Sequence, residues 1–254
     1  MQDCDLTDIG VLVTRAAHQA GGLVRLIEQQ RGRALVWPAL EIRETRDPDS
    51  AEARLGRSWD LMIFVSPNAV DFATRRIRPE DWETRAVAAV GASTARALEQ
   101  IGRPVDWLPE QGYDSEGLLS LAQLAQPKGQ RILIVRGEGG RALLGDTLAE
   151  RGARISYAEV YRRVRPETPP EPLLRRWPEE VQVVTVTSLE VLRNLVAMLG
   201  EPGWLLLSRT PLVVISERMR EVAREQGFTQ VILADGADDR SMVRTICEWK
   251  LQQP

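Results

Sequence analysis

The chain has 254 residues and a formal net charge of −3 at neutral pH, with 43% hydrophobic and 27% charged residues. This length suffices for one large domain or two small ones, and the composition is that of an ordinary soluble globular protein. The near balance of charges, without a basic block, argues against nucleic-acid binding. The lack of about 18 consecutive apolar residues argues against a membrane span.

Histidine and cysteine are scarce, which limits the chemistry that the chain supports. His18 is the only histidine, so we expect a plain surface role for it rather than a metal site or a Ser–His–Asp arrangement. Cys4 and Cys247 are the only cysteines that could pair, and they form neither a CxxC motif nor a disulfide framework. Together with an acidic N-terminus that lacks a secretion signal, this favours a reducing cytoplasm.

Arginine dominates the basic residues. Lys128 and Lys250 are the only lysines among 33 basic residues, so the remaining 31 are arginines. A codon bias across the genome is one explanation. The other is that some arginines face a polyanionic ligand, for which their planar fork is suited.

Short apolar runs alternate with longer amphipathic stretches, a pattern that favours a parallel sheet with crossover helices. The predicted strands, in chain order, are residues 10–14, 34–37, 60–65, 87–90, 105–108, 131–135, 153–157, 182–187, 212–215 and 230–234. The predicted helices fill most of the gaps and include residues 17–30, 67–76, 92–101, 114–124, 138–151, 188–199, 217–226 and 239–251.

The sequence matches itself when it is shifted by about 120 residues. The segment from Val11 aligns with the segment from Ile132, and further along Ser66 falls on Thr187 and Gly91 on Ser216. Four matching segments occur in the same order in both halves. We therefore predict two copies of one α/β module.

Small and hydroxylic residues follow the predicted strands in both copies. In a parallel sheet, ligands bind beyond the carboxyl ends of the strands, where backbone N–H groups and helix N-termini favour carboxylate or phosphate. Alternatively, the serines and threonines serve only as helix N-caps. These residues are Thr14, Ser66, Gly91, Ser93 and Thr94 in one copy, and Gly137, Gly139, Gly140, Thr187, Ser188 and Ser216 in the other.

The glycine-rich turn after residue 135 admits a second interpretation. Gly137-x-Gly139-x-x-Ala142 matches a dinucleotide-binding fingerprint, with Glu159 where a ribose-binding acid is expected. The repeat weakens this hypothesis, because the corresponding turn at Arg15 has no glycines. A non-enzymatic two-lobed module that binds an anionic ligand is a further alternative.

Six motifs then occur in a characteristic order and spacing. They are VLVTR from Val11, WDLMIFVSPNAVDFA from Trp59, AVGASTARAL from Ala89, YDSEGLL from Tyr113, GQRILIVRGEGGRALL from Gly129 and AEVYRR from Ala158. With these motifs the chain resembles the uroporphyrinogen-III synthase family over nearly its whole length. It departs from the family pattern at VTVTSLEV and VISERMREV, where Ser-Pro and Gly-Pro turns are more usual.

The resemblance implies an α/β fold with two similar lobes, each a parallel sheet flanked by helices, joined by a two-stranded antiparallel ladder. Lobe 1 would comprise residues 1–37 and 166–254, and lobe 2 residues 43–157, with interlobe crossings at 38–42 and 158–165. The stretch from Arg165 is predicted to be a linker. A hinge of two strands would let the cleft between the lobes open and close.

The resemblance also implies the activity. The family closes hydroxymethylbilane, a linear tetrapyrrole with acetate and propionate arms, to uroporphyrinogen III, with loss of water and inversion of ring D. No cofactor and no metal are expected, and the protein is expected to be a cytoplasmic monomer. The upstream bilane-forming enzyme is a candidate partner, whereas nucleic acid and membrane are not.

Tyr161 matches the tyrosine of the family's Val-Tyr motif, and it is the predicted catalytic hydrogen-bond donor to the leaving hydroxyl. The alternative is a tyrosine that packs at a strand edge. The predicted substrate-binding residues are Thr14, Arg15, Ser66, Pro67, Asn68, Ala69, Gly91, Ala92, Ser93, Thr94, Arg136, Gly137, Gly139, Gly140, Arg141, Thr187, Ser188 and Ser216.

Overall fold

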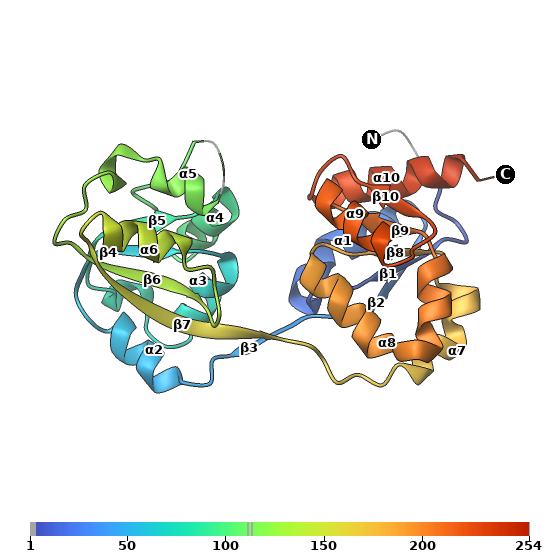
Figure 1. Cartoon of the computed structure of the whole chain (residues 1–254), viewed down its shortest axis with the longest axis horizontal. Coiled ribbons are helices and arrows are strands. Elements are labelled where there is room, and N and C mark those ends of the chain that lie inside the picture. The colour runs from blue at the N-terminus through green and yellow to red at the C-terminus, as the bar shows by residue number, and fades with distance from the viewer. Residues whose placement is uncertain (1–3, 111, 113, 254) are drawn as a thin grey trace. The chain divides into compact units, whose positions relative to one another are not determined.

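The computed structural model describes residues 4–110, 112 and 114–253, so Tyr113 of the YDSEGLL motif lies outside the described residues (Figure 1). The chain forms two compact units. Unit 1 combines Met1–Glu41 with Val164–Pro254, and unit 2 is Ile42–Arg163. Unit 1 is therefore discontinuous in sequence, whereas unit 2 is one continuous segment.

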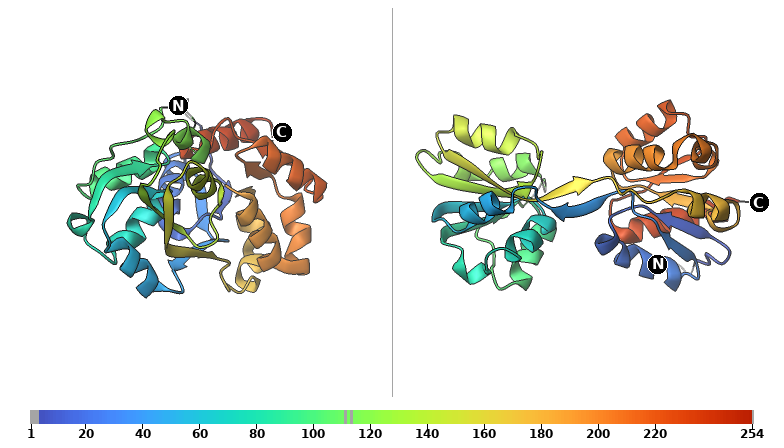
Figure 2. Two further views of the ribbon diagram at one scale, coloured as in Figure 1. Left: turned by 60° about the vertical axis from the view of Figure 1, so that its left-hand side comes forward. Right: turned by 90° about the horizontal axis from the view of Figure 1, so that it is seen from below.

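Unit 1 contains a five-stranded sheet in the order β10-β9-β8-β1-β2, in which every pair is parallel. Helices cover both faces of the sheet (Figure 2), and two separate clusters of buried apolar side chains form the core of the unit. The strands are β1 Gly10–Val13, β2 Arg33–Val36, β8 Val183–Thr185, β9 Leu212–Val214 and β10 Val231–Leu233. The helices are α1 Ala17–Gln29, α7 Glu171–Glu180, α8 Leu189–Arg209, α9 Glu217–Glu225 and α10 Asp239–Leu251.

Unit 2 contains a five-stranded sheet in the order β3-β7-β6-β4-β5. The pairs β7·β6, β6·β4 and β4·β5 are parallel, and helices again cover both faces. The strands are β3 Glu41–Glu44, β4 Trp59–Phe64, β5 Thr84–Ala89, β6 Arg131–Gly137 and β7 Arg154–Val164. The helical segments are α2 Pro48–Leu55, α3 Pro67–Thr74, η1 Pro79–Asp81, α4 Ala92–Gln100, α5 Ser115–Leu119, η2 Ala122–Leu124 and α6 Leu143–Glu150.

The internal repeat is visible in the strand orders of the two sheets. The run β2-β1-β8-β9 of unit 1 corresponds to β7-β6-β4-β5 of unit 2, and an isolated bridge between Ala88 and Trp107 takes the position of β10. Each unit therefore draws strands from both halves of the repeat. The prediction of an α/β fold with parallel sheets is confirmed, but the chain halves that repeat in sequence are not the compact units.

Several boundaries differ from those predicted. Helices α2 and α7 lie outside the predicted elements, and α7 begins at Glu171, inside the predicted linker. Helix α6 begins at Leu143 rather than at residue 138, because the glycine-rich turn remains open. Residues 158–163, which the prediction places in a crossing, lie in β7, which extends to Val164.

The two cysteines are joined. Cys4 and Cys247 form a disulfide with their Cα atoms 5.8 Å apart, although 243 positions separate them in sequence. The bond ties the N-terminal segment of unit 1 to α10. The pairing differs from the expectation of reduced thiols, because the fold brings the two ends of the chain together. None of the helices in the described part of the chain has the length and apolar character that crossing a membrane requires.

Candidate active site

The candidate site of unit 2 lies at the carboxyl ends of β4 and β6. The chain leaves β4 through α3 to β5 on one side, and it later returns to β6 on the other side of β4. The connections that follow β4 and β6 therefore diverge. This is the point in an open parallel sheet where a crevice for ligands forms.

Ser66 follows β4 and is the N-cap of α3, with Pro67 at the first helical position. The extended backbone of Ser66 (φ −162°) directs its side chain over the first turn, where Oγ accepts a hydrogen bond from the Ala69 amide at 3.2 Å. The same oxygen lies 3.1 Å from the hydroxyl of Tyr161 on β7. Ser66 therefore links the start of α3 to the predicted catalytic tyrosine.

Tyr161 is held in the core of unit 2. Only 4% of its surface is exposed, and its ring lies 5.9 Å from that of Phe72. Gly137, at the end of β6, faces the same ring: a Cβ atom there would lie 2.6 Å from Cε2 and Cζ of Tyr161. Glycine is required at position 137 because the tyrosine ring occupies the space of a side chain.

The turn after Gly137 is shaped by Arg136. Its guanidinium pairs with Glu159 at 2.9 Å, donates to the Gly140 carbonyl at 3.2 Å and stacks 3.8 Å from the ring centre of Tyr157. The charge of Arg136 is thus already paired, so its side chain supports the turn and is not free for the predicted substrate contact. Glu159 is likewise occupied by Arg136, which removes the ribose-binding acid that the dinucleotide hypothesis requires.

Glu138 connects the glycine-rich turn to the segment after β3. Its carboxylate accepts hydrogen bonds from the Thr45 hydroxyl at 2.9 Å and from the Arg46 amide at 2.7 Å. The amide of Arg46 is the main cause that holds the pKa of Glu138 below its usual value, with smaller help from Thr45 and opposition from partial burial. These hydrogen bonds favour the ionised carboxylate, which joins the glycine-rich turn to the segment after β3.

The remaining residues of the turn present mainly backbone. Gly139 adopts a left-handed conformation (φ 67°), which favours glycine, and a Cβ there would meet no other atom within 4 Å. Arg141 is exposed, and Gly140 is half-buried. The open turn at residues 138–142 thus leaves room for a ligand to approach its peptide groups.

The third strand end of unit 2 is followed by α4. Gly91 is its N-cap, without a side-chain cap, and Ala92 and Ser93 form the first turn, in which the first N–H groups of a helix lack intrahelical partners. Ser93 is exposed, whereas Thr94 is 2% exposed. The side chain of Thr94 is thus part of the packed interior, and the predicted binding through backbone N–H groups of this turn stays a prediction. In the corresponding turn of α3, Ala69 is also buried and Asn68 is half-buried.

In unit 1 the predicted residues also follow the carboxyl ends of parallel strands, but two of them have structural partners. Thr14 is fully buried and donates to the Thr185 carbonyl at 2.6 Å. Arg15 pairs with Asp239 at 2.5 Å, with its side chain 14% exposed. Neither side chain is available for the predicted contact, because each is used to join elements of unit 1.

The serines of unit 1 act as helix caps. Ser188 accepts from the Val191 amide at 3.1 Å at the start of α8, and Ser216 accepts from the Met219 amide at 3.4 Å at the start of α9. Thr187 is half-buried beside Ser188. The side-chain oxygens of Ser188 and Ser216 therefore act as N-caps, as the alternative interpretation predicts. Because each oxygen accepts in these bonds, the hydroxyl proton can still donate to another group.

A polar pocket of about 380 Å³ adjoins the glycine-rich turn of unit 2. Arg54, which the sequence interpretation missed, donates from this pocket to the Tyr157 carbonyl at 2.6 Å. The signal for it is weak, since Arg54 lies in a helix that was not predicted. The pocket is lined by Thr45, Arg46, Asp47, Ser50, Ala51, Arg54, Arg136, Glu138, Tyr157 and Glu159.

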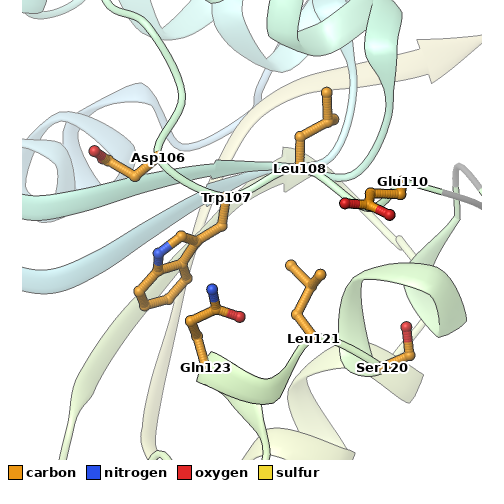
Figure 3. Close-up of a pocket in the computed structure, with 7 residues that line it drawn as sticks. All are labelled: Asp106, Trp107, Leu108, Glu110, Ser120, Leu121 and Gln123. Carbon is orange, nitrogen blue, oxygen red and sulfur yellow. The ribbon is translucent and has the colours of Figure 1, made fainter.

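A second pocket of unit 2, of about 400 Å³, lies between the segment after α4 and the segment around α5 and η2 (Figure 3). Two carboxylates line it, and none of its described lining residues is basic. Such a pocket repels anions, so we do not assign it to an anionic ligand. Its lining residues are Asp106, Trp107, Leu108, Glu110, Ser120, Leu121 and Gln123.

Known proteins match this chain over most of its length. A family model described as uroporphyrinogen-III synthase HemD matches residues 22–244. The uroporphyrinogen-III synthase of Escherichia coli (strain K12) is 34% identical over 248 residues, which cover 94% of this chain and 100% of the relative. That of Salmonella typhimurium is 33% identical over the same length and with the same coverage.

Solved structures show the same fold. A mutant uroporphyrinogen III synthase from the extremely thermophilic bacterium Thermus thermophilus aligns with a TM-score of 0.64 at 19% identity, covering 96% of this chain and 100% of the other. The enzyme from Helicobacter pylori 26695 aligns with a TM-score of 0.60 at 13% identity, covering 95% and 99%.

The fold and the site together define an α/β protein of two parallel-sheet units, with a glycine-rich turn and helix N-termini at the carboxyl ends of the strands. The chain belongs to the uroporphyrinogen-III synthase family.

Proposed function

We propose that the protein cyclises hydroxymethylbilane to uroporphyrinogen III in tetrapyrrole biosynthesis. The observation that carries this proposal is the 34% identity to the Escherichia coli enzyme across 94% of the chain. Ser66 after β4 and Gly137 at the end of β6 lie against Tyr161 of β7, and this arrangement supports the proposal because it brings two hydroxyl groups beside an open, glycine-rich turn.

The proposed reaction is a hydro-lyase step without a cofactor. The carbon–oxygen bond of the terminal hydroxymethyl group breaks, the electron pair stays on oxygen, and a protein proton converts it to water. The cation that remains is delocalised onto the pyrrole nitrogen. Attack by the substituted carbon of ring D gives a spiro intermediate, and the rearranged macrocycle then loses one ring proton, which restores the protonated protein donor.

We propose that backbone N–H groups at the strand ends bind the acetate and propionate arms. In unit 2 these are the groups of residues 66, 68, 91–93 and 139–141, and in unit 1 those beside Thr187, Ser188 and Ser216. Pro67 has no N–H, and the N–H groups of Ala69, Thr94 and Glu138 already donate within unit 2. Positioning of this kind supplies up to roughly 7–11 kcal/mol in the best cases, so it carries most of the catalysis here. The antiparallel ladder between two lobes, the monomeric state and the cytoplasmic location remain predictions.

The Ser66–Tyr161 pair is the proposed source of the proton for the leaving hydroxyl. The family resemblance implies a part for Tyr161 in this proton transfer, and Ser66 is its hydrogen-bond partner. The acid need only be of modest strength, because the pyrrole supplies the driving force for the departure of the hydroxyl. Replacing either hydroxyl should therefore slow turnover without abolishing it.

A coupled assay tests the function. Hydroxymethylbilane is supplied without added metal or nucleotide, the product is oxidised, and isomers I and III are separated. We expect the type III isomer. A ratio of isomers equal to that of the enzyme-free control would refute the assignment, and binding of the bilane without turnover would favour a non-enzymatic binding module instead.

A further inference from the structure

Ser66 and Tyr161 differ in how far a ligand can reach them. Tyr161 is 4% exposed and packs within the apolar core of unit 2, whereas Ser66 is half-buried at the start of α3. We propose that Ser66 is the catalytic residue that touches the leaving hydroxyl, and that Tyr161 is a positioning residue behind it. The inference rests on the proposed function and assigns the two hydroxyls within that site.

The direction of the hydrogen bond follows from satisfying the buried hydroxyl. Among the residues that the structure describes, Ser66 Oγ is the hydrogen-bond partner of Tyr161 Oη. If Ser66 donated to Tyr161, the proton of the buried phenol would have no acceptor, at a cost of about 1–3 kcal/mol. Tyr161 is therefore the donor and Ser66 the acceptor.

The bonds of Ser66 then determine where its own proton points. A serine hydroxyl has two acceptor positions and one proton. The Ala69 amide occupies one acceptor position at 3.2 Å, and Tyr161 occupies the other at 3.1 Å. The proton of Ser66 remains for donation toward the ligand, and both of its partners stabilise negative charge that develops on its oxygen.

The proton transfers balance along this chain. As the carbon–oxygen bond of the substrate breaks, Ser66 Oγ gives its proton to the departing oxygen and water forms. Tyr161 Oη passes its proton to Ser66 Oγ, so the negative charge comes to rest on the phenol oxygen. The proton that the ring carbon loses on macrocycle closure returns along the same path and restores both hydroxyls.

The test compares single and double variants of the pair. Ser66→Ala should lower kcat by about 10–100-fold, at or below the lower end for general acids, and Tyr161→Phe by about 3–30-fold. The double variant should match Ser66→Ala alone, because Tyr161 acts through Ser66. Ser66→Thr, which keeps the hydroxyl, should restore most of kcat, and KM should change little in all of them.

Asp238→Ala is the control for loss of a helix cap away from the candidate site. Asp238 is the N-cap of α10 in unit 1, and its Oδ1 accepts from the Ser241 amide at 3.0 Å. Asp238→Ala should lower the melting temperature, as Ser66→Ala does, yet leave kcat unchanged. The 13Cζ NMR resonance of Tyr161 should shift in Ser66→Ala and not in Asp238→Ala.

Two results would overturn the assignment. A Tyr161→Phe variant that loses as much kcat as Ser66→Ala, with losses that add in the double variant, would show that Tyr161 touches the substrate itself. A Ser66→Ala variant with full kcat would remove Ser66 from the chemistry. Failure of the proposed function is a separate outcome, because the wild-type protein would then yield no excess of the type III isomer.

Discussion

Gly137→Ala is the change for which the structure predicts the most specific effect. The added Cβ atom would lie 2.6 Å from two ring carbons of Tyr161, whereas ordinary contacts of a Cβ atom are 3.4–4 Å. The ring must therefore move by about 1 Å, a displacement that costs about 1–3 kcal/mol in a packed core. The same displacement lengthens the 3.1 Å contact between Tyr161 and Ser66 beyond hydrogen-bond range.

The expected result is a joint loss of stability and turnover. The melting temperature should fall by several degrees, and kcat should fall by about 3–30-fold, as for loss of the phenol hydroxyl, while KM stays nearly constant. Thermal unfolding and the coupled isomer assay measure the two effects. In a Tyr161→Phe background, Gly137→Ala should still lower stability but should cost no further kcat, because the hydroxyl is already absent.

Gly203→Ala controls for crowding without the tyrosine. Its added Cβ would lie 2.7 Å from Leu199 in α8 of unit 1, which is a similar overlap. It should destabilise the protein and leave kcat intact. Equal losses of kcat for Gly137→Ala in the wild-type and Tyr161→Phe backgrounds would refute the reasoning, because the glycine would then act on the substrate directly.

Four further predictions concern the turn, the units and the termini. Gly139→Val should raise KM more than it lowers kcat. The valine strains a residue with a left-handed backbone (φ 67°), and it crowds the peptide groups that we propose bind a carboxylate. An unchanged KM would contradict carboxylate binding at this turn. Residues 1–126 and 127–254, made as separate chains, should each fail to give a dispersed amide NMR spectrum, because the cut separates β4 from β6, its neighbour in the sheet of unit 2; two folded halves would disprove it. Glu138→Gln should lower the melting temperature at neutral pH. This difference from wild type should vanish as the pH falls through the lowered pKa of Glu138, because the ionised carboxylate contributes its stability only above that pH. A difference in melting temperature that is independent of pH would exclude this role. Cys4→Ser should lower the stability of the oxidised protein by on the order of 2–5 kcal/mol and should have no effect after reduction with dithiothreitol, as judged by thermal unfolding.

Local patterns in the sequence predicted much of the fold. The apolar runs that became β1, β4 and β6 each contain four consecutive buried residues, and strands buried on both faces require such runs. Ser66 was identifiable as a residue at a strand end, because serine followed by proline and an amphipathic stretch is typical of a helix start. The sequence patterns do not predict α2 and α7. Helix α2 is short and its pattern is weak, and the pattern of α7 is interrupted by proline.

The sequence by itself therefore determined which segments are apolar, where helices begin after strands, and that one module occurs twice. The tertiary structure alone decided that β4 lies between β5 and β6, and hence that Ser66 meets Tyr161, which is 95 positions away in the sequence. It also decided that Cys4 meets Cys247, which is 243 positions away. The physical reason is that periodicity specifies which face of an element is buried but not which element buries it. Strand order and the contacts of single hydroxyl groups arise only when all of the faces pack together.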